Sequence, residues 1–352
     1  MSLKIFLGAV IVTAITFAAA VVAVVGEAHI ATVETSNQPA FAALHKNPDA
    51  VAKIIIRDAD NGFTLIRGDG GQWTAPDKFD YSVDRDKVRN LVVKMADMQL
   101  IEPKTARPDL YHRLEVGDLD AADAQSRYVR LESKDGTVLA EALFGKTVNH
   151  KTGPANTGIY LRPVGSERAW LVSSDLAIDT EPNKWLDSTI VDLASGVVRR
   201  VAVRPQASRP YAIERKEGED DFHVVDLPDD VAIKQNDVNR IGSEFASLTF
   251  EDVKPKDQMS WPEAADTAKL ETFDNLGIEA RLAKVEDKTW IQMSASYLGD
   301  EADDSEDAKA ARQRAADINQ RVGKWVYQIP DYAADRLRRP LDELLEIASN
   351  TS

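Results

Sequence analysis

Two stretches of the chain, about 150 residues apart, repeat the same order of apolar patterns. The first opens with the branched run VAKIIIRD and the second with VVRRVAVRP, so that Val201 and Val203 stand where the first has Ile54 and Ile56. Each run leads through short alternating segments to residues at helical spacing. In that last part the offset is 150, and it pairs Val88 with Val238, Leu91 with Ile241, Met95 with Phe245 and Leu100 with Phe250. Matched patterns in one order predict an internal duplication.

The first copy shows how each element is specified. The turn DNG at 60–62 separates VAKIIIRD from GFTLIRG, a pattern typical of a β-hairpin. A third short run, GGQWTAP, places Trp73 where it can cover a core, and Phe222 is its counterpart. We expect a helix next, in DRDKVRNLVVKMADMQL, because its apolar residues fall on one face and Asp84 or Asp86 can cap its start.

This order of elements predicts an α+β fold class. We expect two tandem, duplicated units at 48–195 and 196–347, each an antiparallel sheet with a helix on one face. A chain of 352 residues is long enough for two domains of ordinary size. The second unit carries an acidic insertion, GDEADDSED at 299–307, which we expect to be a solvated loop followed by a helix.

The amino terminus holds an apolar run of 21 residues, IFLGAVIVTAITFAAAVVAVV at 5–25, with no charged side chain. As a helix, such a run spans roughly 30 Å, the thickness of the hydrocarbon core of a bilayer. A cleaved signal peptide is the alternative. Signal peptides have apolar runs of about 7–15 residues and a more basic start than the single Lys4 found here. The run therefore predicts an uncleaved transmembrane helix.

Charge on either side of this run predicts its orientation. Lys4 and the amino group precede it, whereas the first lysine after it is Lys46. The positive-inside bias then puts the tail, residues 1–4, in the cytoplasm and the juxtamembrane segment 26–47 outside. We expect a single-pass protein of the bacterial inner membrane with most of its chain in the periplasm. Small residues near i, i+4 spacing also predict a helix-packing interface, at Gly8, Thr13, Thr16 and Ala20.

Composition argues against several classes of function. A net charge of −15 and a pI near 4.9 oppose nucleic-acid binding, which needs a basic surface. The chain has no Cys, so thiolate metal sites, cysteine nucleophiles and disulfides are excluded. The acidic run 299–307 lacks the Gly and Glu positions of a calcium loop. No metal-binding spacing relates the five His residues, which are His29, His45, His112, His150 and His223.

No pattern in the chain selects a nucleophile with its base, so we expect neither an enzyme nor a cofactor. The segment LFGKTVNHKTG does contain Gly145-Lys146-Thr147, which resembles the end of a phosphate-binding loop. Such a loop needs another Gly five residues before the first of these, and that position is Ala140. The run before it has the pattern of a strand, and we expect the three residues to form a turn after it.

Several of these features together resemble a bacterial family catalogued as domain of unknown function 4340, whose members carry one amino-terminal membrane helix. The matching features are a hairpin that ends in Gly71 and Trp73, a helix at 88–100, and the segments ALFGKT, GIYLRPVGSERAWLV and WLDSTIVDL. An opening strand pattern precedes them, with Pro39, Phe41, Leu44, Val51 and Ile54. The resemblance extends over roughly residues 1–350. It implies that Gly145 leaves the sheet at positive φ, a conformation that costs Gly little.

The resemblance implies a setting and not a reaction. Such proteins look like auxiliary parts of ABC-type export or gliding-motility-like systems, beside a permease, an ATPase and another anchored auxiliary protein. We therefore expect a non-enzymatic, membrane-anchored periplasmic scaffold that binds a permease or a sister subunit. The alternative is a periplasmic binding protein for an envelope lipid or glycan, with an apolar cleft between the two repeats near residues 190–200. An envelope hydrolase would need a set of catalytic groups that no motif supplies.

Overall fold

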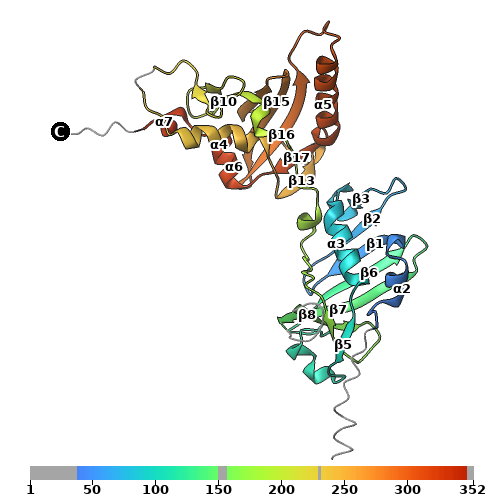
Figure 1. Cartoon of the computed structure of the whole chain (residues 1–352). Helices are drawn as coiled ribbons and strands as arrows, with labels where there is room; N and C mark the ends of the chain where they lie inside the picture. Colours follow the sequence, from blue (N-terminus) through green and yellow to red (C-terminus); the bar gives the residue numbers. More distant parts are fainter. Residues whose placement is uncertain (1–37, 150–156, 229–230, 347–352) are drawn as a thin grey trace, which may run out of the picture. The chain divides into compact units, whose positions relative to one another are not determined.

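The computed structural model describes residues 38–149, 157–228 and 231–346. These residues form two compact units. The first unit holds the described residues up to Thr74 together with Arg85–Glu181. The second holds Ala75–Asp84 and the described residues from Pro182 onward. Each unit is built on one large antiparallel sheet (Figure 1).

The first sheet has nine strands in the order β4-β3-β2-β1-β6-β7-β8-β9-β5. The strands are β1 (Val51–Arg57), β2 (Gly62–Arg67), β3 (Trp73–Ala75), β4 (Tyr81–Ser82), β5 (Leu100–Pro103), β6 (Arg127–Ser133), β7 (Val138–Asn149), β8 (Thr157–Pro163) and β9 (Trp170–Ser173). The same part of the chain forms helices α2 (Ala42–Lys46) and α3 (Arg85–Ala96) and the 3₁₀ turns η1 (Pro48–Ala50), η2 (Pro76–Lys78), η3 (Pro108–Arg113) and η4 (Pro182–Trp185).

The second sheet has eight strands in the order β12-β11-β10-β14-β15-β16-β17-β13. The strands are β10 (Val198–Arg204), β11 (Tyr211–Glu214), β12 (His223–Val224), β13 (Asp252–Pro255), β14 (Asp266–Thr272), β15 (Leu276–Val285), β16 (Lys288–Tyr297) and β17 (Trp325–Gln328). Its helices are α4 (Gln235–Ala246), α5 (Glu306–Val322), α6 (Asp331–Leu337) and α7 (Leu341–Leu344), and its 3₁₀ turns are η5 (Ser195–Val197) and η6 (Lys256–Gln258).

The two sheets repeat one topology. When β4 is set aside, the strands of the second sheet follow the same order as those of the first. The registers agree as well, because Ile54 pairs with Leu131 in the first sheet and Val201 pairs with Leu270 in the second. In both sheets, the central pair has an irregularity at its start, between 51 and 53 and between 198 and 200. The repeated pattern in the sequence therefore corresponds to a sheet that occurs twice with the same topology.

The core of each unit lies between its sheet and its main helix. Alternate residues of the central strands are fully buried, as period-two alternation requires. These are Ile54 and Ile56 in β1 and Val201 and Val203 in β10. The predicted helical periodicity is confirmed, because α3 and α4 both bury the apolar positions that the sequence pairs. The buried residues include Val88, Leu91 and Met95 in α3 and Val238, Ile241 and Phe245 in α4.

The predicted α+β fold class is wrong. Two large antiparallel sheets dominate the described chain, and helices are few. The sequence patterns located hairpins one at a time and could not show that they join. In the structure the later hairpins extend the first, because β6 pairs with β1 and β14 pairs with β10. The transmembrane helix predicted at 5–25 lies outside the described residues. Within the ranges that the structure does describe, no helix is both long and apolar enough to cross a bilayer.

A segment of the first repeat belongs to the second compact unit. Ala75–Asp84, which includes β4, is assigned to that unit, and its Tyr81 ring lies in an aromatic cluster there. Ring centroids are 5.3 Å apart for Tyr81 and Phe250, and 5.0 Å apart for Tyr81 and Trp325. The Tyr327 ring also packs against Phe250, at 5.1 Å. The two compact units are therefore interleaved along the chain, although the two repeats follow one another, and the sequence did not predict this.

The acidic insertion is a loop that a helix follows. Residues 299–305 are mostly exposed, and α5 begins at Glu306 with the Ser305 hydroxyl accepting a hydrogen bond from the backbone N–H of Ala308. The loop is also fastened from within. Arg312 donates to the carbonyl oxygens of Asp300, Glu301 and Asp303 over 2.8–3.0 Å. The loop backbone is therefore held in place by α5, and its carboxylates face solvent.

Candidate functional site

The structure places only part of what the sequence predicts for sites. Gly8, Thr13, Thr16 and Ala20, the predicted helix interface, all lie outside the described residues. Among the residues that are described, no three His, Asp or Glu side chains gather closely enough to hold a metal ion. The ring of His45 has a structural contact instead, because its Nδ1 lies 2.8 Å from the carbonyl oxygen of Ala96.

The expectation that Gly145 leaves the sheet at positive φ is wrong. Gly145 lies inside β7, and its φ is outside the left-handed region. A Cβ atom there would overlap the carbonyl oxygen of Leu114 and come within 2.9 Å of that of Glu115. The next residue, Lys146, donates its backbone N–H to the Leu114 oxygen over 3.2 Å. The glycine is therefore needed because another segment approaches the strand closely.

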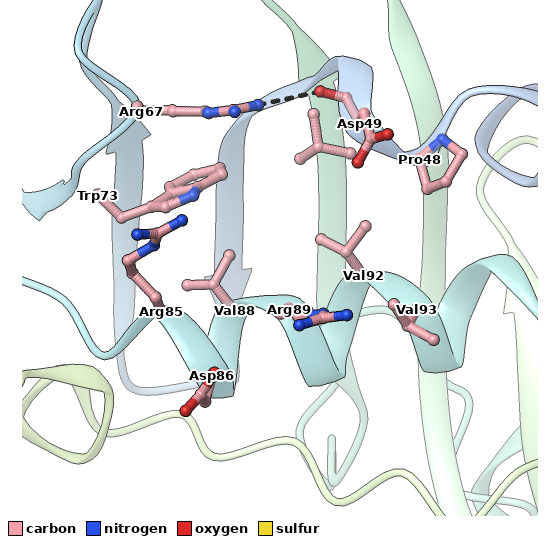
Figure 2. Close-up of a pocket in the computed structure, with 12 residues that line it drawn as sticks. Pro48, Asp49, Arg67, Trp73, Arg85, Asp86, Val88, Arg89, Val92 and Val93 are labelled. Carbon is pink, nitrogen blue, oxygen red and sulfur yellow. Dashed lines mark hydrogen bonds between the residues drawn. The ribbon is translucent and has the colours of Figure 1, made fainter.

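A cleft of about 610 Å³ opens in the first unit, between the β2–β3 turn, η1 and one flank of α3 (Figure 2). Its lining holds three arginines, two aspartates, four valines and a tryptophan, together with Pro48 and Gly71. Figure 2 shows Val88, Val92 and Val93 along α3 and the Arg85 side chain reaching from that helix toward the Trp73 ring. Apolar walls and several cations are thus combined in one depression, which is here called the arginine cleft.

Strand and helix periodicity put the three arginines into this cleft. Phe63 and Leu65 of β2 are buried, and Arg67 lies on the same face at the end of the strand, where the core stops. Arg85 and Arg89 are four residues apart on α3, so they lie one above the other on the helix surface. All three arginines are exposed. The end of a strand and one helical stripe therefore direct three cations into the same space.

These guanidinium groups are largely unpaired within the described chain. Arg67 donates through Nη1 to the carbonyl oxygen of Asp49 over 3.0 Å, the bond drawn in Figure 2. In the part of the chain that the structure describes, Arg85 and Arg89 form no ion pair with a carboxylate. The carboxyl groups of Asp49 and Asp86 also line the cleft, so three positive charges face two negative ones. In a chain with a net charge of −15, this is a local excess of positive charge.

The second repeat has a smaller cleft at the same place, of about 430 Å³, in which the arginine of the strand is buried. The strand registers make Arg215 the counterpart of Arg67, and Phe222 the counterpart of Trp73. Arg215 is only 8% exposed, and its guanidinium carbon lies 4.5 Å from the centre of the Phe222 ring. This burial lowers the pKa of Arg215 from its ordinary value. Its guanidinium donates to three carbonyl oxygens, those of Val198 at 2.8 Å, Asp220 at 3.2 Å and Ser195.

The flank of α4 differs from that of α3 in the same sense. Three pairs of residues correspond at the offset of 150, Arg85 with Gln235, Arg89 with Asn239 and Val93 with Ser243. Asn239 accepts the backbone N–H of Phe222 over 2.9 Å and donates to the carboxylate of Asp221 over 2.7 Å. Gln235 donates to the carbonyl oxygen of Phe222 over 2.8 Å. The two amides on the flank of α4 are therefore hydrogen-bonded to the β11–β12 turn, whereas Arg85 and Arg89 project into the larger cleft of the first repeat.

Sequence reasoning did not single out the arginine cleft. Arg85 and Arg89 lie on the polar side of a predicted amphipathic helix, which by itself indicates only a solvated face. A signal was nonetheless present in the repeat, because the second copy has neutral amides at the same two positions, Gln235 and Asn239. A charge that appears in only one of two copies of a fold marks a position that the fold does not require.

Comparison with known proteins gives one match. The family model of the domain of unknown function DUF4340 matches residues 73–275, which is more than half of the chain. The matched range runs from Trp73 in the arginine cleft to the end of β14 and contains both main helices, α3 and α4. No curated protein and no solved structure matches. The chain therefore belongs to the DUF4340 family, whose domain has no known function.

Proposed function

We propose that this protein is a non-enzymatic binding subunit anchored in the bacterial inner membrane by residues 5–25. Its two sheets stand in the periplasm, where it serves as an auxiliary part of an ABC-type transport system and holds a permease or a sister auxiliary subunit. The apolar run at the amino terminus and the charges around it support the location. The transport setting rests on the family resemblance alone.

The observation that carries the binding role is the contrast between two copies of one cleft, of about 610 Å³ in the first repeat and about 430 Å³ in the second. Arg215 is stacked and hydrogen-bonded inside its own unit, whereas its counterpart Arg67 is exposed, as are Arg85 and Arg89. Arginine and tryptophan are the residues most enriched among those that dominate binding energy at protein interfaces. The second repeat has neutral amides, Gln235 and Asn239, at the positions of Arg85 and Arg89, so the fold does not require cations at these two positions. We therefore assign these arginines to the binding of a partner.

The chemistry of the cleft suits recognition. A guanidinium group stays protonated in proteins, so it offers donors for hydrogen bonds and a fixed charge but does not serve as a base at neutral pH. The remaining ionisable groups in the lining are the carboxylates of Asp49 and Asp86. Asp86 already has an interaction within the chain. The lining thus supplies binding contacts rather than a pair of groups set for proton transfer.

In-cell crosslinking followed by solubilisation, affinity purification and mass spectrometry tests this function. The informative variant is Arg85→Gln/Arg89→Asn, which resembles the second repeat at these two positions. The matched control is Arg57→Gln/Arg113→Asn, which makes the same change of charge at two exposed positions of the same unit outside the cleft. We expect wild type and control to recover a permease or sister subunit, and the cleft variant to recover several-fold less.

Two outcomes would contradict the proposal. Equal recovery of the same partners by the cleft variant and the control would show that the arginine cleft does not hold them. Recovery of the protein alone, together with a lipid or glycan, would favour the envelope-ligand carrier. A thermal melt of each purified variant separates these results from misfolding, and we expect all three melts to agree within about 2 °C because the substituted side chains are exposed.

A further inference from the structure

We propose that the arginine cleft of the first repeat binds an acidic segment of a partner polypeptide, with carboxylates against Arg67, Arg85 and Arg89. This inference rests on the proposed binding function and deepens it by naming the chemistry of the partner. It draws on three observations, namely the residues of the second copy of the site, the spacing of the cations, and the size and lining of the cleft.

The second copy shows which chemistry lies beside this helix flank. There the exposed turn between β11 and β12 has the acidic sequence EGEDD at 217–221. Its Asp221 carboxylate accepts a hydrogen bond from Asn239, on the helix flank. The residue just before the aromatic ring in the first repeat is Gln72, so no carboxylate stands there. The first repeat thus has cationic residues on the flank and lacks the acidic segment that its copy contains.

The spacing of the cations matches an extended acidic chain. Arg85 and Arg89 lie one helical turn apart, with about 5–6 Å between their Cβ atoms. Side chains at i and i+2 of an extended segment share one face and stand roughly 6.6 Å apart. Alternate acidic residues can therefore meet both guanidinium groups in turn, each through a charge-assisted bond that is stronger than a neutral one. Arg67 stands across the cleft, at the end of β2, and can receive a third carboxylate.

Size and lining favour a polypeptide over a small anion. The cleft measures about 610 Å³ and extends from Pro48 to Val93, so one carboxylate or phosphate group would leave most of it empty. Valines and the Trp73 ring cover the space between the charges. Such surfaces suit the methylene groups of Glu and Asp and the backbone between them. The site therefore combines electrostatic contacts with room for a short stretch of chain.

The test is a titration of the full-length protein, in detergent micelles, into a fluorescein-labelled peptide EGEDD, followed by fluorescence anisotropy. A peptide QGQNN of the same length but without side-chain charge is the control ligand. We expect EGEDD to bind and QGQNN to bind about tenfold more weakly or not at all. We expect Arg85→Gln/Arg89→Asn to weaken the binding of EGEDD by about tenfold and Arg57→Gln/Arg113→Asn to leave it unchanged. Raising the salt concentration should weaken binding to the wild type.

Three results would overturn the inference, and each is distinct. Similar binding of EGEDD and QGQNN would exclude carboxylate recognition. Equal weakening in the two double variants would show that net charge, and not the cleft, attracts the peptide. Displacement of EGEDD by succinate or inorganic phosphate at the same concentration of charge would assign the site to small anions. If EGEDD fails to bind while the cleft variant still loses its partners in cells, the partner chemistry is wrong and the binding function stands. If both tests fail, both proposals fall.

Discussion

Gly145 shows how one residue records a close approach between two segments. Gly145 lies in β7, and the carbonyl oxygens of Leu114 and Glu115 approach its Cα closely. We predict that Gly145→Ala lowers the free energy of unfolding by about 2–3 kcal/mol, since overpacking a tight site usually costs about 1–3 kcal/mol. Gly117→Ala is the matched control, because a Cβ atom at Gly117 meets nothing within 4 Å. Urea unfolding followed by tryptophan fluorescence measures both, and equal effects of the two changes would contradict the argument.

Two glutamates show that the duplication reaches individual ion pairs. Glu132 on β6 and Glu271 on β14 hold the same place in their sheets. Burial raises the pKa of both carboxyl groups, but hydrogen bonds and charge from two neighbouring cations outweigh it and hold each pKa below its usual value of 4.5. The cations are Arg130 and Lys53 for Glu132, and Arg199 and Lys269 for Glu271.

These glutamates should make stability depend on pH. A pKa that is lower in the folded state contributes stability above the unfolded value of 4.5. That stability is lost as the pH falls through the folded pKa. We predict that Glu132→Gln/Glu271→Gln loses less stability than wild type between about pH 5 and pH 3. Glu217→Gln/Glu263→Gln, at two exposed positions, is the control and should keep the wild-type slope. Urea unfolding midpoints measured across this pH range test the prediction. Parallel curves of midpoint against pH for all three proteins would refute it.

At the scale of elements, the segment around β4 ties a piece of the first repeat into the second unit. Tyr81 packs there against the rings of Phe250 and Trp325, and Lys78 forms an ion pair with Asp252. We predict that Tyr81→Ala destabilises the second unit by about 3–5 kcal/mol, the usual cost of deleting a buried aromatic ring. Phe79→Ala is the control in the same segment, because Phe79 is 41% exposed. Hydrogen exchange should speed up in β13 and β17 for Tyr81→Ala only, and faster exchange confined to β6–β8 would show that the segment belongs elsewhere.

The sequence predicted elements better than it predicted their assembly. The two main helices could be recognised because α3 and α4 have equal length and bury apolar residues at the same relative positions. The offset of 150 between these positions remains visible even where the residue types differ. The fold class was missed because period-two patterns identify strands but do not show which strands pair over long distances. The pairing of β1 with β6 joins residues separated by more than seventy positions, and that pairing turns separate hairpins into one sheet. No local sequence pattern shows that residues 75–84 belong to the second unit, because the residues that they contact lie far along the chain.

At the scale of the whole molecule, duplication separates what the fold requires from what one copy adds. The two repeats share strand order, register and helix length, so these features specify the sheet. Both copies have a cleft at this place, but Arg85 and Arg89 line it in the first copy only, so these two cations are not specified by the sheet. From the sequence alone, this difference was visible at 85, 89, 235 and 239, but the structure was needed to show that the first pair lines a cleft with Arg67 and Trp73.

The chain also combines two predicted contact surfaces, the arginine cleft and the small residues of the apolar run. If residues 5–25 form a membrane helix, Gly8 and Thr16 lie two turns apart on one side and allow a neighbouring helix to approach closely. We predict that Gly8→Leu/Thr16→Leu lowers recovery of membrane partners several-fold after solubilisation. Ala14→Leu/Ala18→Leu adds similar bulk on the other side of the predicted helix and should leave recovery unchanged.

Two surfaces on one chain should also reinforce each other. When one contact is made, the second forms at a raised effective concentration, so the loss of either surface weakens the complex by more than its own affinity suggests. We therefore expect the helix variant and Arg85→Gln/Arg89→Asn to lower recovery separately, and the combined variant to abolish it. The same crosslinking and mass spectrometry measure all of them. If the combined variant recovered as much partner as the single-surface variant with the lower recovery, the two surfaces would not be engaging one complex. The anchor would then serve only to hold the chain at the membrane.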